Sequence, residues 1–308
     1  MRIIYMGTPD FAVNALVSLV DAGHEVVACY TQPDKPKGRS KALQPTPVKV
    51  KAFEYGIPVY QPVKLREAEN VEKIKQYAPD AIVVAAYGQI LPESILNIPK
   101  YGCINIHASL LPKYRGAAPI ERAIIDGESK TGVTTMYMAK GLDTGDIIEQ
   151  SVVSIMSDDT GETLTDKLAK TGAELILSTL DKLENGTAER TVQNDDESCY
   201  SPMLTKALCP IDFTKTIDEV HNKIRGLSPW PTATAVLGGK KVKLHSSEKT
   251  ELKGGAPREI TVSHGEMLVA CKDGKLLKIL ELQPEGKKRM SAEAFLLGHK
   301  IQSGDSFK

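Results

Sequence analysis

The sequence has no long apolar run, and none of its hydrophobic stretches approaches the roughly 18 residues that a membrane span needs. Its first residues, MRIIYMG, enter a strand pattern directly, without a secretory or transit-type leader. Repeats and biased tracts are missing as well, and 41% hydrophobic and 25% charged residues are typical of an ordinary globular protein. We therefore expect a cytoplasmic protein that contacts no membrane, with enough chain for two domains.

Cysteine is scarce, and its distribution favours neither a disulfide framework nor a zinc site. The five cysteines are odd in number, widely spaced and free of any CxxC pair. They are Cys29, Cys103, Cys199, Cys209 and Cys271. We expect reduced thiols and no bound metal.

The glycine-rich fingerprint of dinucleotide-binding folds is also missing. Residues 2–6, a helix from about Phe11 to Asp21 and the stretch GHEVVACYTQ predict an opening βαβ unit. Its first turn reads GTPD, which lacks the glycines that let a backbone approach a pyrophosphate closely. NAD binding is therefore disfavoured, and we expect Gly7 to serve tight packing between strand and helix.

A net charge is absent from the whole chain but not from its parts. Residues 201–308 carry 18 Lys/Arg against 12 Asp/Glu, which leaves 21 against 27 for residues 1–200. A basic C-terminal third on an acidic body indicates a polyanionic partner at one end, although a modest positive excess is also compatible with a plain solvated surface.

The apolar runs that are present predict an α/β fold. The run PDAIVVAAYG at 79–88 is nearly continuous, as expected of a central parallel strand covered on both faces. The stretch GCINIHASLLP at 102–112 follows as the next strand, and TGVTTMYM and DIIEQSVVSI supply two more before a long helix over 160–183. We expect a Rossmann-like, mostly parallel sheet.

Periodicity disappears over 184–202, which marks a domain boundary. We expect a first domain over 1–187, a linker over 188–204 and a second domain over 205–308. The second domain shows a helix at 216–225, short alternating strands and a final helix near 291–297. Short strands with glycine turns predict a small OB-like β-barrel. The predicted strands lie near 232–237, 240–247, 258–263, 266–271 and 275–282.

Two polar side chains share one face of the strand in GCINIHASLLP. Residues two apart in a strand project the same way, so Asn105 and His107 point together while Ile104 and Ile106 pack on the other face. A carboxamide and an imidazole can both donate hydrogen bonds to a developing oxyanion. Asp143, in the loop GLDTGD, could return to the same sheet edge and hold the imidazole. Taken singly, each of these residues is more often structural.

The segment QPDKPKGRSKALQPTP at 32–47 is too long and too polar for an ordinary connection between a strand and a helix. It contains four basic residues and only one acidic residue, Asp34. One interpretation is a basic loop that becomes ordered on a phosphate-bearing substrate, and the other is a solvated insertion. The basic residues are Lys35, Lys37, Arg39 and Lys41.

Several motifs together resemble the formyltransferases that use 10-formyltetrahydrofolate. They are GTPDFA at 7–12, the N-x-H of the strand with SLLP at 109–112, RGAAPI at 115–120, and TGV with GLDTGD. The basic loop, SPMLTKALCPIDF at 201–213 and RGLSPWPTA at 225–233 favour the members that act on methionyl-tRNA. The resemblance covers nearly the whole chain and becomes thin after about Lys240. It departs from the family at Phe213, where tryptophan is common.

The resemblance implies a set of roles. The catalytic residues would be Asn105, His107 and Asp143, and no metal would take part. The folate-binding segment would be Ser109, Leu110, Leu111 and Pro112. Arg39, with Lys37 and Lys41 beside it, would reach the initiator tRNA. The second domain would bind tRNA as well.

The implied reaction moves the formyl group of 10-formyltetrahydrofolate, a co-substrate, to the α-amino group of methionyl initiator tRNA in translation initiation. We expect a monomer. The main alternative is formyl transfer to a small amine, such as an amino sugar or glycinamide ribotide. Two others are a formyltetrahydrofolate hydrolase and an RNA-binding protein that keeps only the enzyme's fold.

Overall fold

The computed structural model describes residues 1–37 and 42–308, which form two compact units. The first unit holds residues 1–116, 131–154 and 165–200, and the second holds 117–130, 155–164 and 201–308. Helix α5 (Pro119–Ile125) therefore packs with the second unit, although it follows the strand of Asn105 in the chain. Each unit is built from several separate segments of the sequence. We had expected one boundary instead, with a linker over 188–204 between two continuous domains. That division of the chain remains a prediction.

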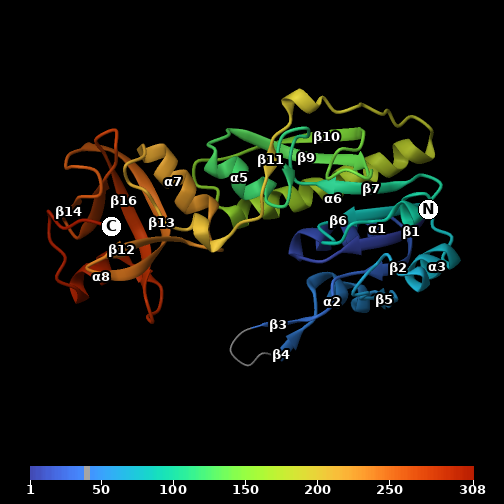
Figure 1. The fold of residues 1–308 in the computed structure, drawn as a ribbon, viewed down its shortest axis with the longest axis horizontal. Helices are drawn as coiled ribbons and strands as arrows, with labels where there is room; N and C mark the ends of the chain where they lie inside the picture. The colour runs from blue at the N-terminus through green and yellow to red at the C-terminus, as the bar shows by residue number, and fades with distance from the viewer. Residues whose placement is uncertain (38–41) are drawn as a thin grey trace. The chain divides into compact units, whose positions relative to one another are not determined.

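A seven-stranded sheet forms the centre of the first unit, in the order β10-β9-β7-β6-β1-β2-β5 (Figure 1). The strands from β5 to β7 pair in parallel, and β9 runs antiparallel to β7. The predicted mostly parallel α/β sheet is thus confirmed. Its strands are β1 (Arg2–Gly7), β2 (Glu25–Tyr30), β5 (Val59–Tyr60), β6 (Ala81–Ala85), β7 (Cys103–His107), β9 (Lys130–Tyr137) and β10 (Ile147–Ser154).

Helices cover both faces of this sheet. On one face, Ile4 and Met6 of β1 pack with Val71 and Ile74 of α3. On the other, Ile106 of β7 meets α6 so closely that a Cβ at Gly172 would lie 2.9 Å from its Cγ2 atom. The helices of this unit are α1 (Val13–Asp21) after the short η1 (Asp10–Ala12), α2 (Pro47–Glu54), α3 (Ala68–Gln76), α4 (Glu93–Leu96) and most of α6 (Gly161–Glu184).

Gly7 ends β1 where the chain turns into α1. A Cβ there would lie 2.8 Å from the Cβ of Ala12 and 3.1 Å from the carbonyl oxygen of Ala85. Such contacts are closer than real side chains make, so only glycine fits. The expected role of Gly7 in tight packing is confirmed.

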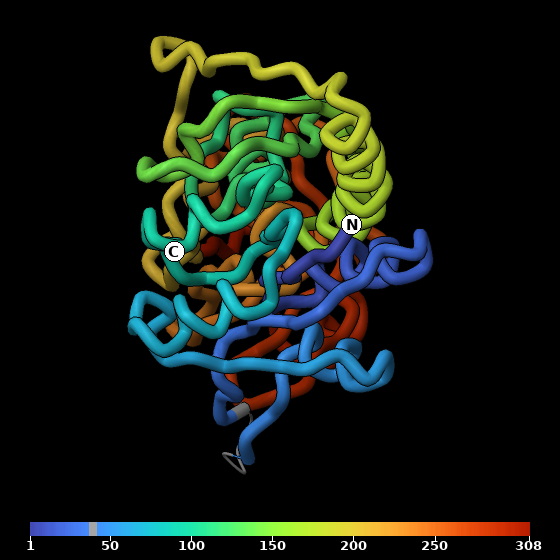
Figure 2. Tube along the Cα trace, turned by 90° about the vertical axis from the view of Figure 1, so that its right-hand side faces the viewer, coloured from blue at the N-terminus to red at the C-terminus, as the bar shows by residue number. Residues whose placement is uncertain are grey.

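A short hairpin stands in the segment that we expected to be an irregular loop. Strands β3 (Lys35–Lys37) and β4 (Ala42–Gln44) pair antiparallel and project away from the sheet in Figures 1 and 2. Asp34 at its base accepts hydrogen bonds from Lys49 Nζ and Gln61 Nε2, both at 2.7 Å. The bond from Lys49 is the main reason that the pKa of Asp34 is lowered.

The second unit is an antiparallel β structure with two flanking helices, α7 (Ile217–Gly226) and α8 (Ala292–Gly298). Its main sheet has the order β12-β13-β16-β15-β14, and β17 pairs with β16. The predicted strands and helices are all present, and β13 continues six residues beyond its predicted end at 247. The strands are β12 (Ala233–Leu237), β13 (Lys240–Lys253), β14 (Ile260–Ser263), β15 (Glu266–Ala270), β16 (Lys275–Pro284) and β17 (Met290–Ser291).

The last residues of the chain close this sheet into a barrel. The backbone of Lys308 exchanges two hydrogen bonds with Val236 of β12, at 3.0 and 2.8 Å. Three residues earlier, Asp305 accepts a bond from the Ile260 N–H at the start of β14, at 2.7 Å. Phe307 is 1% exposed and stacks on Phe213, with ring centroids 5.3 Å apart. The barrel is as predicted, but its closure by isolated β-bridges of the terminal residues was not.

The remaining short elements lie between the larger ones. Strands β8 (Arg115–Gly116) and β11 (Tyr200–Ser201) form a small separate sheet, and the 3-10 turns are η2 (Asp195–Glu197) and η3 (Lys206–Leu208). Of the helices in the described residues, none is long and apolar enough to cross a membrane.

Candidate active site

His107 and Asp143 meet at the end of β7. The Nδ1 atom of His107 lies 3.7 Å from Oδ2 of Asp143, and both side chains are largely buried. The other ring nitrogen, Nε2, lies 2.9 Å from the carbonyl oxygen of Tyr114. A carbonyl oxygen can only accept, so Nε2 carries the proton and Nδ1 is the edge available for chemistry.

Asn105 lies two residues before His107 on the same strand, and the residue is 9% exposed. Within residues 1–37 and 42–308, no group forms a hydrogen bond with its carboxamide. Buried amides usually have partners, so an unpaired one that still reaches solvent is ready to bind a ligand. Strand β7 therefore presents one free amide and one oriented imidazole on the same face.

Backbone geometry brings Asp143 to this place. Its φ of +52° is a left-handed conformation that Asp tolerates better than most residues. Oδ2 accepts a hydrogen bond from the backbone N–H of Gly116 at 2.9 Å. Gln193 donates to the Asp143 carbonyl at 2.8 Å. Sequence reasoning assigned no role to Tyr114 or Gln193, because Tyr114 acts through its backbone carbonyl and Gln193 lies in a segment that we expected to be a linker. Gly116 entered only as part of the RGAAPI motif, without a role of its own.

The segment from Ser109 to Pro112 leaves β7 and is held by the neighbouring strands. Thr134 Oγ1 of β9 donates to the Ser109 carbonyl at 2.6 Å and accepts from the Leu111 N–H at 3.1 Å. Gln150 Nε2 of β10 donates to the Leu111 carbonyl at 2.9 Å. Ser109 and Leu111 are buried, and Leu110 is half-buried. The predicted folate-binding segment is thus a braced loop beside His107.

Gly132 of β9 supports the same segment from behind. A Cβ at this position would lie 2.2 Å from the carbonyl oxygen of Ser151 and 2.5 Å from Cδ2 of Leu110. One of these contacts is with backbone, which cannot move aside cheaply. Leu110 therefore keeps its position only if residue 132 is glycine.

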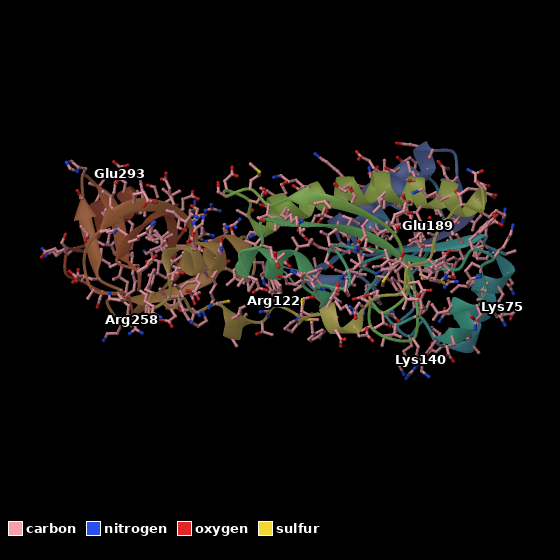
Figure 3. All side chains as sticks on the ribbon, turned by 90° about the horizontal axis from the view of Figure 1, so that it is seen from above. Lys75, Arg122, Lys140, Glu189, Arg258 and Glu293 are labelled. Atoms are coloured by element: carbon pink, nitrogen blue, oxygen red, sulfur yellow. The ribbon has the colours of Figure 1, made fainter. Side chains whose placement is uncertain are left out.

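Two exposed apolar side chains flank the carboxyl ends of the strands, where α/β sheets place their ligands. Ile90, in the loop after β6, is 86% exposed, and Leu142, next to Asp143, is 59% exposed. Lys140 precedes that second loop, and its side chain points outward (Figure 3). An apolar pair beside a polar site suits a ligand with a flat, partly apolar ring system.

Some predicted site residues cannot be placed. Arg39 and Lys41 lie outside the described residues. Lys37 is the last residue of β3, and its side chain is also outside the description. Among the described residues, no group of three or more His, Cys, Asp or Glu side chains is arranged to hold a metal ion.

Exposed lysines gather at one end of the barrel in the second unit. Lys240 and Lys241 begin β13, and Lys287 and Lys288 follow β16. The two turns are neighbours, because the Glu285 N–H donates to the Lys241 carbonyl at 3.2 Å. In the described part of the chain, none of these four lysines has an ion-pair partner. We call them the turn lysines.

Solved structures that share this fold include an N-formyltransferase and HypX. An N-formyltransferase from Helicobacter canadensis, solved with folinic acid and dTDP-3-aminofucose, matches with a TM-score of 0.70 and 23% identity, covering 92% of this chain and 99% of that one. HypX from Aquifex aeolicus, solved with tetrahydrofolic acid, matches with a TM-score of 0.68 and 18% identity, covering 98% and 48%. At these identities the likeness concerns the fold.

Sequence comparison extends the likeness to both units. The model of the formyl transferase family matches residues 1–180, and that of the formyl transferase C-terminal domain matches residues 203–300. The methionyl-tRNA formyltransferase of Agathobacter rectalis is 48% identical over 308 residues, covering 100% of this chain and 99% of the relative. That of Geobacter metallireducens is 50% identical over 306 residues, covering 99% and 97%. The chain therefore belongs to the formyl transferase family, among the methionyl-tRNA formyltransferases.

Proposed function

We propose that this chain transfers the formyl group of 10-formyltetrahydrofolate to the α-amino group of methionyl initiator tRNA. The observation that carries the chemistry is the free Asn105 amide beside His107, whose Nδ1 edge faces Asp143 at 3.7 Å. The choice of acceptor rests on identity of about one half with methionyl-tRNA formyltransferases along the full chain, including the second unit. We further propose a monomer that works in the cytoplasm.

The reaction begins when the neutral amine attacks the formyl carbon and a C–N bond forms. The carbonyl oxygen becomes an oxyanion, to which Asn105 donates a hydrogen bond. The imidazolium form of His107, which carries a proton on Nδ1 as well as on Nε2, donates a second through Nδ1. Asp143 keeps its carboxylate toward this edge and accepts the proton that the attacking amine loses. The bond to N10 of the folate then breaks, and N10 takes up a proton. One proton leaves the amine and one reaches N10, so no net proton is released.

Hydrogen bonds around His107 support this assignment. The bond from Nε2–H to the Tyr114 carbonyl fixes the ring plane and leaves only Nδ1 to serve the reaction. The 3.7 Å gap to Asp143 is longer than a direct hydrogen bond, so an entering N–H or a water can take part between the two groups. Donors of this kind typically contribute about 3 to 4 kcal/mol to lowering a barrier.

The folate is proposed to lie along Ser109, Leu110, Leu111 and Pro112. Thr134 and Gln150 brace this segment, so it offers a preformed edge to the ligand. The formyl carbon would then lie against Asn105 and His107.

The tRNA is proposed to meet two basic regions. One is the β3–β4 hairpin, with Lys37, Arg39 and Lys41 as contacts, where Asp34 is already paired with Lys49 at the base. The other is the set of turn lysines on the barrel, which have no ion partners among the described residues and are free to neutralise phosphates.

A direct test follows labelled formyl from 10-formyltetrahydrofolate to purified methionyl initiator tRNA. We expect transfer to the aminoacyl end and none to uncharged tRNA. His107→Ala should lower turnover by about 10²- to 10³-fold while folate affinity changes little, because the ring acts on the transition state. Near-normal turnover in this variant would refute the proposed role of His107.

The same assay separates the other candidates. Amino-sugar nucleotides or glycinamide ribotide as better acceptors than charged tRNA would indicate a small-amine formyltransferase. Formate release without any amine would indicate a hydrolase. Binding of tRNA with no use of the folate would indicate an RNA-binding protein.

A further inference from the structure

Gln193 lies in the segment after α6 and is 8% exposed, and both ends of its amide are hydrogen-bonded. Its Nε2 group donates to the carbonyl of Asp143 at 2.8 Å and to that of Gly145 at 2.7 Å. Its Oε1 atom accepts from Nε of Arg115 at 3.0 Å. One amide therefore joins the Asp143 loop to the segment that follows the folate-binding residues.

The two loop carbonyls depend on this amide. No backbone N–H of the described residues donates to the carbonyl of Asp143 or of Gly145. The loop also turns through the unusual φ of +52° at Asp143, a conformation that its surroundings must stabilise. A side chain that binds carbonyls on both sides of this turn determines where the carboxylate points.

The segment around Gln193 is itself anchored on both sides, which makes it a firm support. Thr191 exchanges two backbone hydrogen bonds with Ile147 at the start of β10, at 2.8 and 2.9 Å. Farther along, the carbonyl of Cys199 accepts from the Arg115 N–H at 2.9 Å. We name residues 191–199 the strap.

We infer that Gln193, alone among the strap residues, is a positioning residue for Asp143. Gln193 acts by holding the loop so that Asp143 Oδ2 stays between the Gly116 N–H and Nδ1 of His107. The hydrogen bonds of its side chain among the described residues all go to groups of the protein itself. The inference rests on the proposed function for its kinetic readout, and its structural readout is independent of it.

Two substitutions test whether the hydrogen bonds that Gln193 donates to the Asp143 and Gly145 carbonyls are needed, separately from its bond with Arg115. Gln193→Glu keeps the shape and still accepts from Arg115, but it places carboxylate oxygen against the two carbonyls. Gln193→Leu keeps a similar volume and removes every hydrogen bond. Both should lower kcat by roughly 10- to 100-fold, the range typical of outer groups that orient a catalytic residue without contacting the substrate. KM for the folate should change little, because its segment is braced by Thr134 and Gln150.

Asp195→Asn is the matched control. Asp195 lies two residues along the strap, is 82% exposed and binds a different nitrogen of Arg115 at 2.8 Å. It makes no contact with the Asp143 loop in the described structure, so kcat should be unchanged. If only the hydrogen bond from Arg115 to residue 193 mattered, Gln193→Glu would stay active, because a glutamate still accepts that bond.

A double-mutant cycle tests whether Gln193 acts through Asp143. In the Asp143→Ala background, adding Gln193→Glu should lower kcat no further, since the group being positioned is gone. A full additional loss would overturn the inference, as would unchanged kcat in both single variants.

Amide hydrogen exchange supplies the readout that does not need activity. Exchange in a peptide covering 141–146 should speed up in Gln193→Leu and Gln193→Glu, while a peptide covering 103–107 stays protected. Unchanged exchange in the loop would also overturn the inference. A wild-type protein without formyl transfer would defeat the proposed function, and the exchange result would still decide the role of Gln193.

Discussion

Asn105 and Thr134 are both buried polar residues of neighbouring strands, but their hydrogen bonding differs. The Asn105 amide has no partner among the described residues, whereas Thr134 Oγ1 bonds Ser109, Leu111 and Gln150. A free group at the reacting edge is available to a substrate, and a saturated one maintains structure. The two residues should therefore respond oppositely to removal of their polar atoms.

Asn105→Ala should keep the free energy of unfolding within about 1 kcal/mol of the wild type, because no protein hydrogen bond is lost. Its kcat should fall by about 10²- to 10³-fold. Thr134→Val should instead cost about 1–3 kcal/mol of stability, since buried partners lose their bonds. Denaturant unfolding and steady-state kinetics measure both, and a stability loss in Asn105→Ala as large as in Thr134→Val would contradict the distinction.

Gly132→Ala should damage folate use through Leu110. The added methyl would overlap the Ser151 carbonyl and Leu110, so the strand must shift at a cost of about 1–3 kcal/mol. KM for the folate should rise as the braced segment moves. Gly298→Ala is the control, because nothing lies within 4 Å of a Cβ at that position. Equal changes in the melting temperature of the two variants would show that the close contacts at Gly132 are unimportant.

Among the elements, α7 carries a buried histidine that makes the second unit sensitive to pH. His221 bonds Ser247 Oγ through Nδ1 at 3.0 Å and the Ser157 carbonyl through Nε2 at 3.3 Å. Burial, and then the charges of Arg225 and Lys249, lower its pKa below the ordinary value of 6.5, although the bond to Ser157 opposes this shift. The folded state therefore keeps the ring neutral where the unfolded chain binds a proton.

The sign of the pH effect follows from that difference. Below pH 6.5 the unfolded state binds more protons, so the stability of the second unit falls as the pH drops from 6.5 toward the folded pKa. His221→Gln keeps a donor but removes the titration, so its loss of stability between pH 7.5 and 5.5 should be smaller than that of the wild type. Urea unfolding at the two pH values measures this, and parallel losses in both proteins would contradict it.

The terminal segment 305–308, which joins the barrel through isolated β-bridges, leads to a second prediction at this scale. Phe307→Ala should cost about 3–5 kcal/mol in the second unit, because its ring is 1% exposed and stacks on Phe213. Lys308→Ala should be nearly neutral, since Lys308 contributes its backbone. The fluorescence of Trp230, the single tryptophan, reports on this unit during denaturant unfolding. Equal effects of the two changes would show that the terminal residues do not complete the core.

Elements whose apolar residues recur at regular spacing were predictable from the sequence. Elements that depend on contacts between distant segments were not. The continuous apolar run of β6 and the alternation of polar and apolar residues in β7 identified both strands. Topology allowed Asp143 to return to the sheet edge of His107, but it was the resemblance to a known family that singled it out. The segment 35–44 has one proline and three lysines without an alternation of polar and apolar residues, so nothing in the sequence predicted the pairing of β3 with β4. Gln193 gave no signal either, because its partners are carbonyls, which every residue has.

At the scale of the whole molecule, the two parts of the chain carry opposite net charges. The excess of six positive charges in residues 201–308 includes the turn lysines, while residues 1–200 carry an excess of six negative charges. A polyanion should therefore be attracted mainly by the second unit and the basic hairpin. Figure 3 shows Arg258 and Glu293 projecting from the second unit, so its surface keeps charges of both signs.

Replacing Lys287 and Lys288 by alanine should weaken tRNA use and reduce its dependence on salt. Each phosphate contact adds about 0.7 to 0.9 to the slope of log K against log salt, so the slope should fall by about 1.5. Folate affinity should not change. Lys75→Ala, an exposed lysine of α3 in the first unit, serves as the control; an unaltered salt slope in the double variant would exclude these two lysines from the tRNA surface.

The position of residues 305–308 in the barrel also bears on how the second unit is made. Synthesis proceeds from the N-terminus, and these residues come after every strand of the barrel in the sequence. The hydrogen bonds through which they join β12 to β14 therefore cannot form before all of those strands have been synthesised. The strands of the seven-stranded sheet all precede residue 155, so that sheet can form earlier than the closed barrel.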